Sequence, residues 1–575
     1  MVRILDHAPV VGEPVLKAEA DLAPQAWLSR CNPPLRTHAS GPLAGLTFAI
    51  KDNMDVAGMP TTAGCPTFAF TPAEHAVVVR KLLAAGATLA GKTNLDQFAC
   101  GLNGTRSPYG AVPNAFHPAY VSGGSSSGSA YVVATGQVDF ALGTDTAGSG
   151  RVPAGLNNIV GLKPSKGLVS TRGVLPAAQS VDCVSVFART VDVAAKVLEV
   201  LAGYDAHDAY SRPLTLHAQP WGANFRFGIP SRCKFFGDAQ AEAAFEKGIA
   251  QLKALGGIPV AIDYSPLAAA ADLLYNSALV AERYAAIQPF FDAHEAEVME
   301  PVRSIIAKGR NYSAADLYAA QTLLRSYGQR AVVMWDDIDV LLVPTAPTHY
   351  TIAQMQADPV VLNRHLGEYT NFVNLLDYAA IAVPSSIRDD GLPFGVTLIG
   401  PCGSDWQLAD LGQRLHHLTG LKQGFTALNL PVAQSILVQA ATKKEATLAL
   451  TVVGAHLTGM PLNGQLTERG ARLVQATTTA PHYRLYALPN TTPPKPGLKR
   501  VASGGAAIAV EVWDVPIAQV GSFLALIPAP LGLGKVELAD GSWVTGFICE
   551  GFALDAAEDV TPFGGWRAYM QSLKR

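Results

Sequence analysis

Charged residues are scarce in this chain, making up 15% of its 575 residues, and the basic and acidic side chains nearly balance at a net charge of -3. The absence of a basic excess or stripe argues against a nucleic-acid partner. Disorder as the main state is excluded, because 49% of the residues are hydrophobic and the chain is long enough to bury several cores. Long uninterrupted helices are not expected either, because 53 glycines and 39 prolines punctuate the sequence, and a coiled coil is thereby excluded.

Cysteine is also sparse. The seven cysteines show no CxxC spacing and no histidine lies at metal-ligand spacing, so we expect reduced thiols and no metal site. Neither a phosphate-binding loop nor a dinucleotide fingerprint occurs, and we therefore expect no cofactor. The N-terminus lacks the apolar region of a signal peptide, which favours the cytoplasm. The apolar stretch 515–534 contains Gln519, Pro528, Pro530 and three glycines, so we expect turns and a strand there and no membrane span.

The hydrophobic pattern divides the chain into two domains. Residues 1–430 alternate short apolar runs with amphipathic helical stretches, which is typical of an α/β domain with a mostly covered sheet. Within this domain, residues 46–50, 75–85 and 88–90 predict a strand, a helix and a strand. Residues 431–446 lose clear periodicity and are interpreted as a linker. Residues 447–575 predict a small β-rich α+β domain.

Two glycine-rich segments carry the strongest chemical signal. Residues 122–128 read SGGSSSG and residues 143–155 read GTDTAGSGRVPAG. Turns of this kind can expose a serine hydroxyl and direct several backbone N–H groups into one cavity, as a nucleophile with an oxyanion hole requires. The alternative is a flexible linker, but both segments lie in mid-domain, and the second contains Asp145 and Arg151, which we interpret as an ion pair or turn caps.

The usual base for such a serine is missing, because none of the thirteen histidines adjoins either segment. Lys51 is a substitute. It directly follows the apolar run LTFAI, so its stem is expected to be buried with the amine at a strand end, and burial lowers the pKa of a lysine.

The segments FAIKDNMDVAG, GGSSSGSA and GTDTAGSGRVPA, in this order, closely resemble the amidase signature family. The resemblance implies a mixed central sheet covered by helices and a Ser-cisSer-Lys triad. In that triad Ser149 is the nucleophile, Ser125 bridges after a cis peptide bond, and Lys51 is the base. A neutral Lys51 would accept the proton of Ser125, which accepts that of Ser149. The implied oxyanion-hole amides are those of Thr146, Ala147, Gly148 and Ser149.

Residues 273–286, LLYNSALVAERYAA, predict a helix in which Tyr275 and Arg283 lie about 80° apart, so that both can reach one cavity. Arginine suits a planar carboxylate because it donates two parallel hydrogen bonds. The alternative is a solvent-exposed arginine paired with a carboxylate one turn away, but the neighbouring positions there are apolar. The segment resembles the substrate-recognition helix of allophanate hydrolases, which implies that Tyr275 and Arg283 bind the carboxylate of the substrate.

The region from residue 447 onward contains VVGAHLTGMPLNGQL, YRLYALP and AIAVEVWDVP. It resembles the C-terminal domain of allophanate hydrolases, a relative of the γ-glutamyl cyclotransferase fold. The resemblance implies that a protonated His456 serves decarboxylation of the first product; a purely structural histidine beside Gly454 is the alternative. The loop GSFLALIPAPLGLG has no Asp or Glu where true cyclotransferases carry an acid, so cyclotransferase activity is not expected.

Together these resemblances imply an amidohydrolase acting on linear amides. It would convert allophanate to ammonia and N-carboxycarbamate and then remove carbon dioxide, in the breakdown of urea or cyanuric acid. A homodimer and a functional link to a urea carboxylase are also implied. Two alternatives stay open: another amidase, such as a glutaminase subunit of a tRNA-dependent amidotransferase, and a C-terminal domain that serves only as an assembly module.

Overall fold

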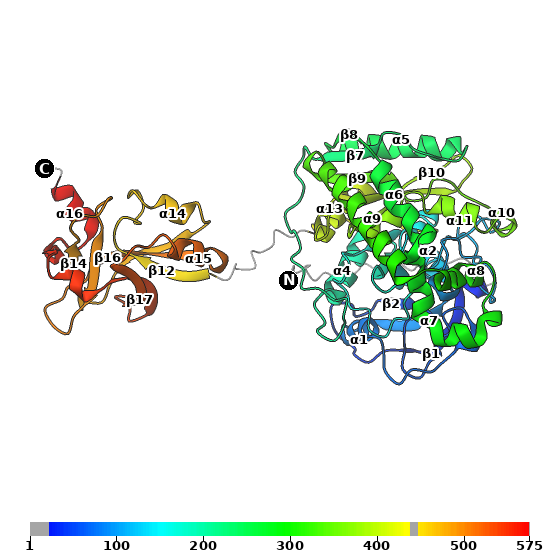
Figure 1. Cartoon of the computed structure of the whole chain (residues 1–575), viewed down its shortest axis with the longest axis horizontal. Helices are drawn as coiled ribbons and strands as arrows, with labels where there is room; N and C mark the ends of the chain where they lie inside the picture. Colours follow the sequence, from blue (N-terminus) through cyan, green and yellow to red (C-terminus); the bar gives the residue numbers. More distant parts are fainter. Residues whose placement is uncertain (1–21, 437–446, 574–575) are drawn as a thin grey trace. The chain divides into compact units, whose positions relative to one another are not determined.

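The computed structural model describes residues 22–436 and 447–573. Two compact units are present, Met1–Ala440 and Ala441–Arg575, and each is described by itself (Figure 1). Most of the expected linker, residues 437–446, lies outside the described residues. Among the described residues, no helix is both long and apolar enough to cross a membrane.

The larger unit is built on a mixed sheet of eleven strands, in the order β1-β3-β2-β4-β6-β5-β10-β11-β9-β7-β8. Strand β2 pairs in parallel with β3 and β4, whereas β4 pairs antiparallel with β6. The strands are β1 (Trp27–Leu35), β2 (Thr47–Lys51), β3 (Thr88–Thr93), β4 (Phe140–Asp145), β5 (Val160–Lys163), β6 (Cys183–Ala188), β7 (Arg226–Pro230), β8 (Ile258–Ile262), β9 (Val340–Pro344), β10 (Ala379–Ile387) and β11 (Pro393–Gly400).

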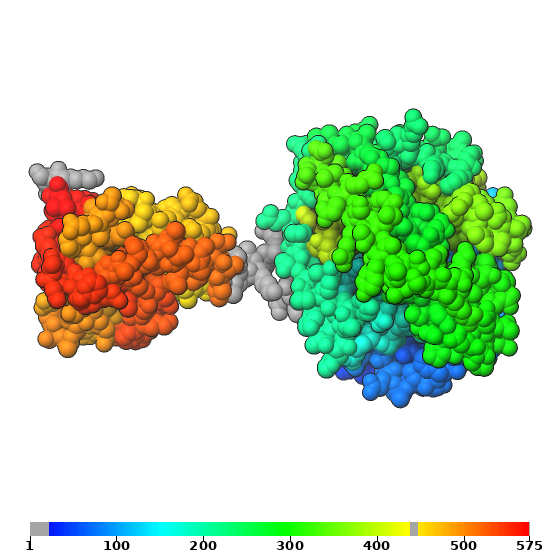
Figure 2. Space-filling model, viewed as in Figure 1, coloured from blue at the N-terminus to red at the C-terminus, as the bar shows by residue number. Residues whose placement is uncertain are grey.

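Helices surround this sheet, and those between residues 265 and 332 cover much of the face of the larger unit that Figure 2 shows. The α-helices of the unit are α1 (Val77–Ala84), α2 (Ser127–Ala134), α3 (Val152–Leu156), α4 (Val191–Leu201), α5 (Ala239–Ala254), α6 (Ser265–Asn276), α7 (Ala281–His294), α8 (Val302–Ala307), α9 (Ala314–Val332), α10 (Ile352–Ala357), α11 (Val361–Leu366), α12 (Asn371–Leu375) and α13 (Asp405–Thr419).

The strand-helix-strand unit predicted near the N-terminus is present as β2, α1 and β3, with the two strands parallel. Helix α1 ends just before Gly86, whose φ of +89° favours glycine; a Cβ there would lie 2.7 Å from the carbonyl oxygen of Ser40. Strand β2 ends at Lys51 and lies between β3 and β4 in the sheet. This unit therefore delivers the lysine to the end of a central strand.

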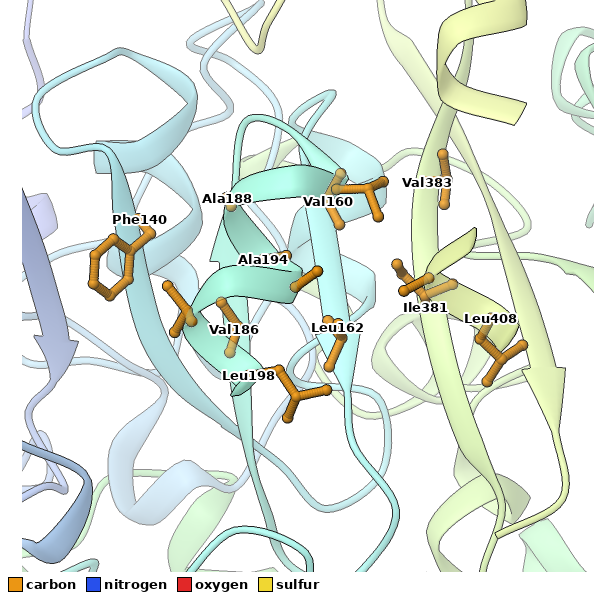
Figure 3. Close-up of a cluster of buried hydrophobic side chains, with 14 of the residues drawn as sticks. Phe140, Val160, Leu162, Val186, Ala188, Ala194, Leu198, Ile381, Val383 and Leu408 are labelled. Atoms are coloured by element: carbon orange, nitrogen blue, oxygen red, sulfur yellow. The ribbon is translucent and has the colours of Figure 1, made fainter. Parts of the chain in front are cut away.

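Two hydrophobic clusters pack on opposite faces of β4. Phe140 and Leu142 belong to a cluster that includes residues of α4 and α13, whereas Ala141 belongs to a cluster with α2. Because successive strand side chains point to opposite faces, helices cover both sides of the sheet here. Figure 3 shows the first cluster, in which Leu198 of α4 and Leu408 of α13 lie among side chains of the strands.

The single helix predicted over residues 273–286 is not formed. Helix α6 ends at Asn276, a short 3-10 turn covers Ala278–Val280, and α7 begins at Ala281. The break lies at Ser277, which is extended (φ -140°, ψ -179°). Its hydroxyl donates to the carbonyl of Leu273 and accepts from the amide of Leu279, so the serine offers the backbone an alternative to helical hydrogen bonds.

The smaller unit contains a five-stranded sheet, β13-β16-β12-β18-β17, and a three-stranded sheet, β15-β14-β19. Its strands are β12 (Thr447–Val452), β13 (Arg472–Thr478), β14 (Tyr483–Ala487), β15 (Pro496–Arg500), β16 (Ala509–Pro516), β17 (Leu531–Glu537), β18 (Trp543–Cys549) and β19 (Glu558–Asp559), and its helices are α14 (Gly464–Thr467), α15 (Ile517–Leu524) and α16 (Trp566–Ser572).

The prediction of turns and a strand over residues 515–534 is wrong in its first half, which forms α15. Pro516 precedes the helix and Pro528 follows it, so the prolines bound the helix instead of breaking it. Phe523 packs its ring against Phe547 of β18 and is buried, which anchors the helix on the five-stranded sheet.

Candidate active site

Lys51 lies at the end of β2 and is fully buried. Its Nζ is hydrogen-bonded to Ser125 Oγ at 2.6 Å and to Thr144 Oγ1 of β4 at 2.7 Å. The peptide bond between Gly124 and Ser125 is cis. The structure therefore brings the predicted base and the predicted bridging serine into direct contact.

Burial lowers the pKa of Lys51 from 10.5 to about 7, against the opposing effect of Asp96, Asp182 and Asp145, whose negative charges favour the protonated amine. An amine with a pKa near neutral pH is deprotonated in a large fraction of molecules. It can then accept a proton from a hydroxyl within hydrogen-bond distance.

Asp96 organises the loop that holds Ser125 in place. Its amide donates to the carbonyl of Ser125 at 3.0 Å, and its carboxylate accepts from the amides of Asn103, Gly104 and Arg106. A Cβ on Gly124 would lie 2.2 Å from Asp96 Oδ2, so a glycine is required for this close approach. Asp96 was not predicted, because it lies outside the glycine-rich motifs.

Ser149 lies in the turn that follows β4. The predicted ion pair between Arg151 and Asp145 is present at 2.9 Å with both side chains fully buried, and Asp145 also accepts from the amides of Gly148 and Gly150. These bonds fix the turn on either side of the serine. Ser149 Oγ donates to the carbonyl of Gly101 at 3.3 Å.

One of the four predicted oxyanion-hole amides, that of Gly148, donates to Asp145 Oδ1 at 2.9 Å in the structure. The amides of Thr146, Ala147 and Ser149 have no acceptor among the residues that the structure describes. These three are therefore the donors that a developing oxyanion can use.

Asp182 is the residue before β6, and its negative charge acts on both Lys51 and Arg283. Its carboxylate accepts from the Thr146 hydroxyl at 2.5 Å and from the amides of Ala177 and Ala178. Burial raises the pKa of Asp182 to about 6, partly offset by the Thr146 hydrogen bond and by the positive charge of Arg283. The negative charge of Asp182 also favours the protonated form of Lys51 and so opposes the effect of burial on the pKa of the lysine.

Tyr275 and Arg283 meet although the helix between them is broken. The Nη2 of Arg283 donates to the Tyr275 hydroxyl at 3.2 Å, and its guanidinium lies 5.0 Å from the centre of the Tyr275 ring. Arg283 is only 4% exposed, yet its Nε and Nη1 have no hydrogen-bond partner among the described residues. Buried guanidinium donors without partners are costly, and a bound carboxylate could accept from one of them together with Nη2.

Glu282, the neighbour of Arg283, fixes the start of α7. Its two carboxylate oxygens accept from the amide and the hydroxyl of Ser180, each at 2.7 Å. The segment that carries Ser180 also carries Asp182, so this contact ties α7 to the loop beside Thr146. The carboxylate of Glu282 is therefore hydrogen-bonded to the segment that carries Asp182. It forms no ion pair with Arg283 within the part of the chain that the structure describes.

A cavity of about 390 Å³ includes Tyr275 in its lining. Arg106, Lys234, Lys308 and Arg364 also line it, against only two acids, Asp272 and Glu368. The balance of charge suits an anionic ligand. Within residues 22–436 and 447–573, no three His, Cys, Asp or Glu side chains cluster as a metal site requires.

His456 lies in the smaller unit, beyond the end of β12. Its Nε2 is 2.9 Å from Gln465 Oε1, and its ring stacks on Phe547 with the centres 5.1 Å apart. Burial lowers the pKa of His456, although the hydrogen bond to Gln465 acts in the opposite direction. These surroundings thus disfavour the protonated His456 that the resemblance implies.

Residues 17–409 match the amidase family, and residues 448–571 match the allophanate hydrolase C-terminal domain. The chain belongs to the amidase family. The α/β fold predicted from the sequence, with its mixed sheet and its smaller β-rich C-terminal part, is confirmed.

Several relatives of this amidase family member cover both units. Urea amidolyase of Saccharomyces cerevisiae is 44% identical over 548 residues, which is 93% of this chain but 30% of that protein. The chain thus spans less than a third of the urea amidolyases it matches. Allophanate hydrolase of Kluyveromyces lactis superposes with a TM-score of 0.72 at 42% identity, covering 96% of this chain and 94% of that one. A glutamyl-tRNA(Gln) amidotransferase subunit of Haloarcula marismortui is 33% identical, and the match covers 65% of this chain and 96% of that protein.

Proposed function

We propose that this chain is an allophanate hydrolase in which the larger unit cleaves the terminal amide of allophanate. The observation that carries the proposal is Arg283, which is 4% exposed, donates to the Tyr275 hydroxyl and holds two guanidinium nitrogens without a partner among the described residues. Allophanate has a primary amide at one end and a carboxylate at the other. Arg283 and Tyr275 would bind the carboxylate and leave the amide for Ser149.

The proposed reaction begins at the contact of Lys51 with Ser125, and it requires the Ser149 hydroxyl to turn from the carbonyl of Gly101 to Ser125. The neutral amine takes the proton of Ser125, which takes that of Ser149, and the Ser149 oxygen attacks the amide carbonyl. The amides of Thr146, Ala147 and Ser149 receive the developing negative charge. When the C–N bond breaks, the proton returns through Ser125 to the nitrogen, and ammonia leaves. Water then attacks the acyl-enzyme by the same proton route and releases N-carboxycarbamate.

For the smaller unit we propose decarboxylation of N-carboxycarbamate with His456 as proton donor. Its position in a cavity beside Gln465 and Phe547 supports this role. We further propose domain limits of 1–430 and 447–575 with a linker at 431–446, and a relationship of the C-terminal domain to the γ-glutamyl cyclotransferase fold.

The biological setting is proposed on the names of the relatives. Urea amidolyases suggest urea breakdown, and we infer a urea carboxylase as the source of allophanate; breakdown of cyanuric acid is the other pathway that yields this substrate. We also propose a cytoplasmic homodimer.

The test is product analysis with the purified full chain. Release of ammonia from allophanate, lost in Lys51→Ala and Ser149→Ala, would support the proposal. Glutamine serves as the second substrate, because a glutaminase subunit is the competing function. Ammonia from glutamine together with none from allophanate would overturn the assignment.

A further inference from the structure

A cavity of about 200 Å³ in the smaller unit contains His456 in its wall. Gln465, Thr492 and Lys495 supply further polar side chains, and the rest of the lining is mainly apolar, including Leu526 and Phe547. The lining contains no Asp or Glu, and Lys495 is its one permanently charged side chain. Apolar walls strengthen the interaction of that charge with an anion, because they exclude water.

Lys495 has no counter-ion among the residues that the structure describes. The ion pairs of the described C-terminal residues are formed by Arg484, Arg500 and Arg567. The charge of Lys495 also contributes, after burial, to the lowered pKa of His456, which places the two groups within electrostatic reach of each other. A half-buried, unpaired ammonium beside a histidine is the arrangement expected of an anion site.

The backbone around Lys495 is fixed against the segment that carries His456. The next residue, Pro496, packs on Gly454, where a Cβ would lie 2.3 Å from Pro496 Cδ. The carbonyl of Lys495 also accepts a hydrogen bond from the amide of Leu488. The lysine is therefore held at the cavity by its own backbone and does not reach it from a free loop.

We propose that Lys495 binds a carboxylate of N-carboxycarbamate and holds this dianion against His456 for decarboxylation. The inference rests on the proposed function of the chain, and it names the group that recognises the intermediate. N-carboxycarbamate carries two carboxylates on one nitrogen, so a single cation can hold one of them while the other leaves. The apolar part of the wall suits the release of neutral carbon dioxide.

The chemical step balances with the groups of this cavity. The bond between the nitrogen and the departing carboxylate carbon breaks, its electron pair stays on the nitrogen, and carbon dioxide leaves. The nitrogen takes one proton from protonated His456, which leaves a carbamate monoanion and a neutral imidazole that solvent reprotonates. Lys495 remains protonated throughout. The bound dianion offsets the charge of Lys495 and favours the protonated imidazole, which burial by itself disfavours.

The test follows 13C-labelled allophanate by NMR in the full chain and compares Lys495→Met with wild type. Methionine keeps the stem of the side chain and removes the charge. We expect ammonia release at the wild-type rate and decay of N-carboxycarbamate slowed about 10- to 100-fold, the range for losing one charged hydrogen bond. Lys495→Arg keeps the charge and should restore part of the rate. The matched control is Lys499→Met, because Lys499 is exposed and lies four residues away, outside the cavity lining.

Malonate gives an independent binding readout, because its methylene replaces the nitrogen of the intermediate. It should inhibit decay of N-carboxycarbamate in wild type and in Lys499→Met, and at least tenfold more weakly in Lys495→Met. Decay in Lys495→Met as fast as in wild type would overturn the inference, as would equal inhibition of Lys495→Met and wild type by malonate. If wild type releases no ammonia from allophanate, the proposed function itself fails. Ammonia release by wild type therefore distinguishes a failure of the proposed function from a failure of the inference on Lys495.

Discussion

Each unit places a lysine beside its proposed reacting group, and the two lysines differ in burial. Lys51 is fully buried, is hydrogen-bonded to two hydroxyls, and has a pKa lowered to about 7 by that burial. Lys495 is half-buried and lines an open cavity whose described wall offers it no counter-ion. The same side chain is therefore suited to proton transfer in one unit and to anion binding in the other, because burial decides which of its two forms is favoured.

The largest expected effect comes from removing Ser149, the proposed nucleophile. Ser149→Ala should lower kcat for ammonia release from allophanate by about 10⁴-fold or more, because the remaining groups only bind and polarise the amide. Ser304→Ala, at an exposed position of α8, is the control and should match wild type. A loss of less than tenfold in Ser149→Ala would exclude it as the nucleophile.

Arg283→Ala separates substrate binding from proton transfer in the larger unit. We expect kcat/KM to fall about 100-fold, mainly through KM, because a charged hydrogen-bonding clamp is lost. Arg303→Ala is the matched control, since Arg303 forms an exposed ion pair with Glu300. An unchanged KM measured for allophanate would remove the carboxylate clamp from the mechanism.

His456→Ala tests whether the two units act in sequence. Ammonia from the first cleavage should appear at the wild-type rate while N-carboxycarbamate accumulates, because only the proton donor for decarboxylation is missing. The intermediate can be followed by 13C NMR. Wild-type decay of the intermediate would assign His456 a structural role.

The pH dependence of ammonia release should report the amine of Lys51. A protonated amine cannot accept a proton, so kcat/KM should fall about tenfold for each pH unit below the pKa of about 7 and level off above it. His456→Ala should give the same profile, because His456 lies in the other unit. A rate independent of pH between 6 and 8 would contradict Lys51 as the base.

The smallest expected effect concerns the packing that positions Lys495. Gly454→Ala places a Cβ 2.3 Å from Pro496 Cδ, and the resulting shift should slow decay of N-carboxycarbamate a few-fold without altering ammonia release. Gly551→Ala, at a glycine without a positive φ and with no atom within 4 Å of the added Cβ, controls for glycine substitution alone. Equal decay in both variants would show that Lys495 tolerates displacement.

Much of the larger unit was predictable, because its signals are local. The run LTFAI and the helix stopped by Gly86 predict β2, α1 and β3, and the glycine-rich motifs mark Ser125 and Ser149. Thr144, Asp96 and Asp182 were missed, because each is an ordinary residue whose importance comes from a partner far away in the sequence. The proline-bounded helix α15 was missed as well, because an apolar run of this kind fits a helix or a strand equally well.

The sequence by itself determined the chemical groups: a lysine after a buried strand, two serines in glycine-rich turns, and an arginine with no acidic residue three or four positions away. Only the tertiary structure decided how these groups behave. It lowers the pKa of Lys51 by burial, brings Tyr275 to Arg283 across a broken helix, and assigns the amide of Gly148 to Asp145. The physical reason is that burial and charge depend on segments that lie far apart along the chain and meet only when it folds.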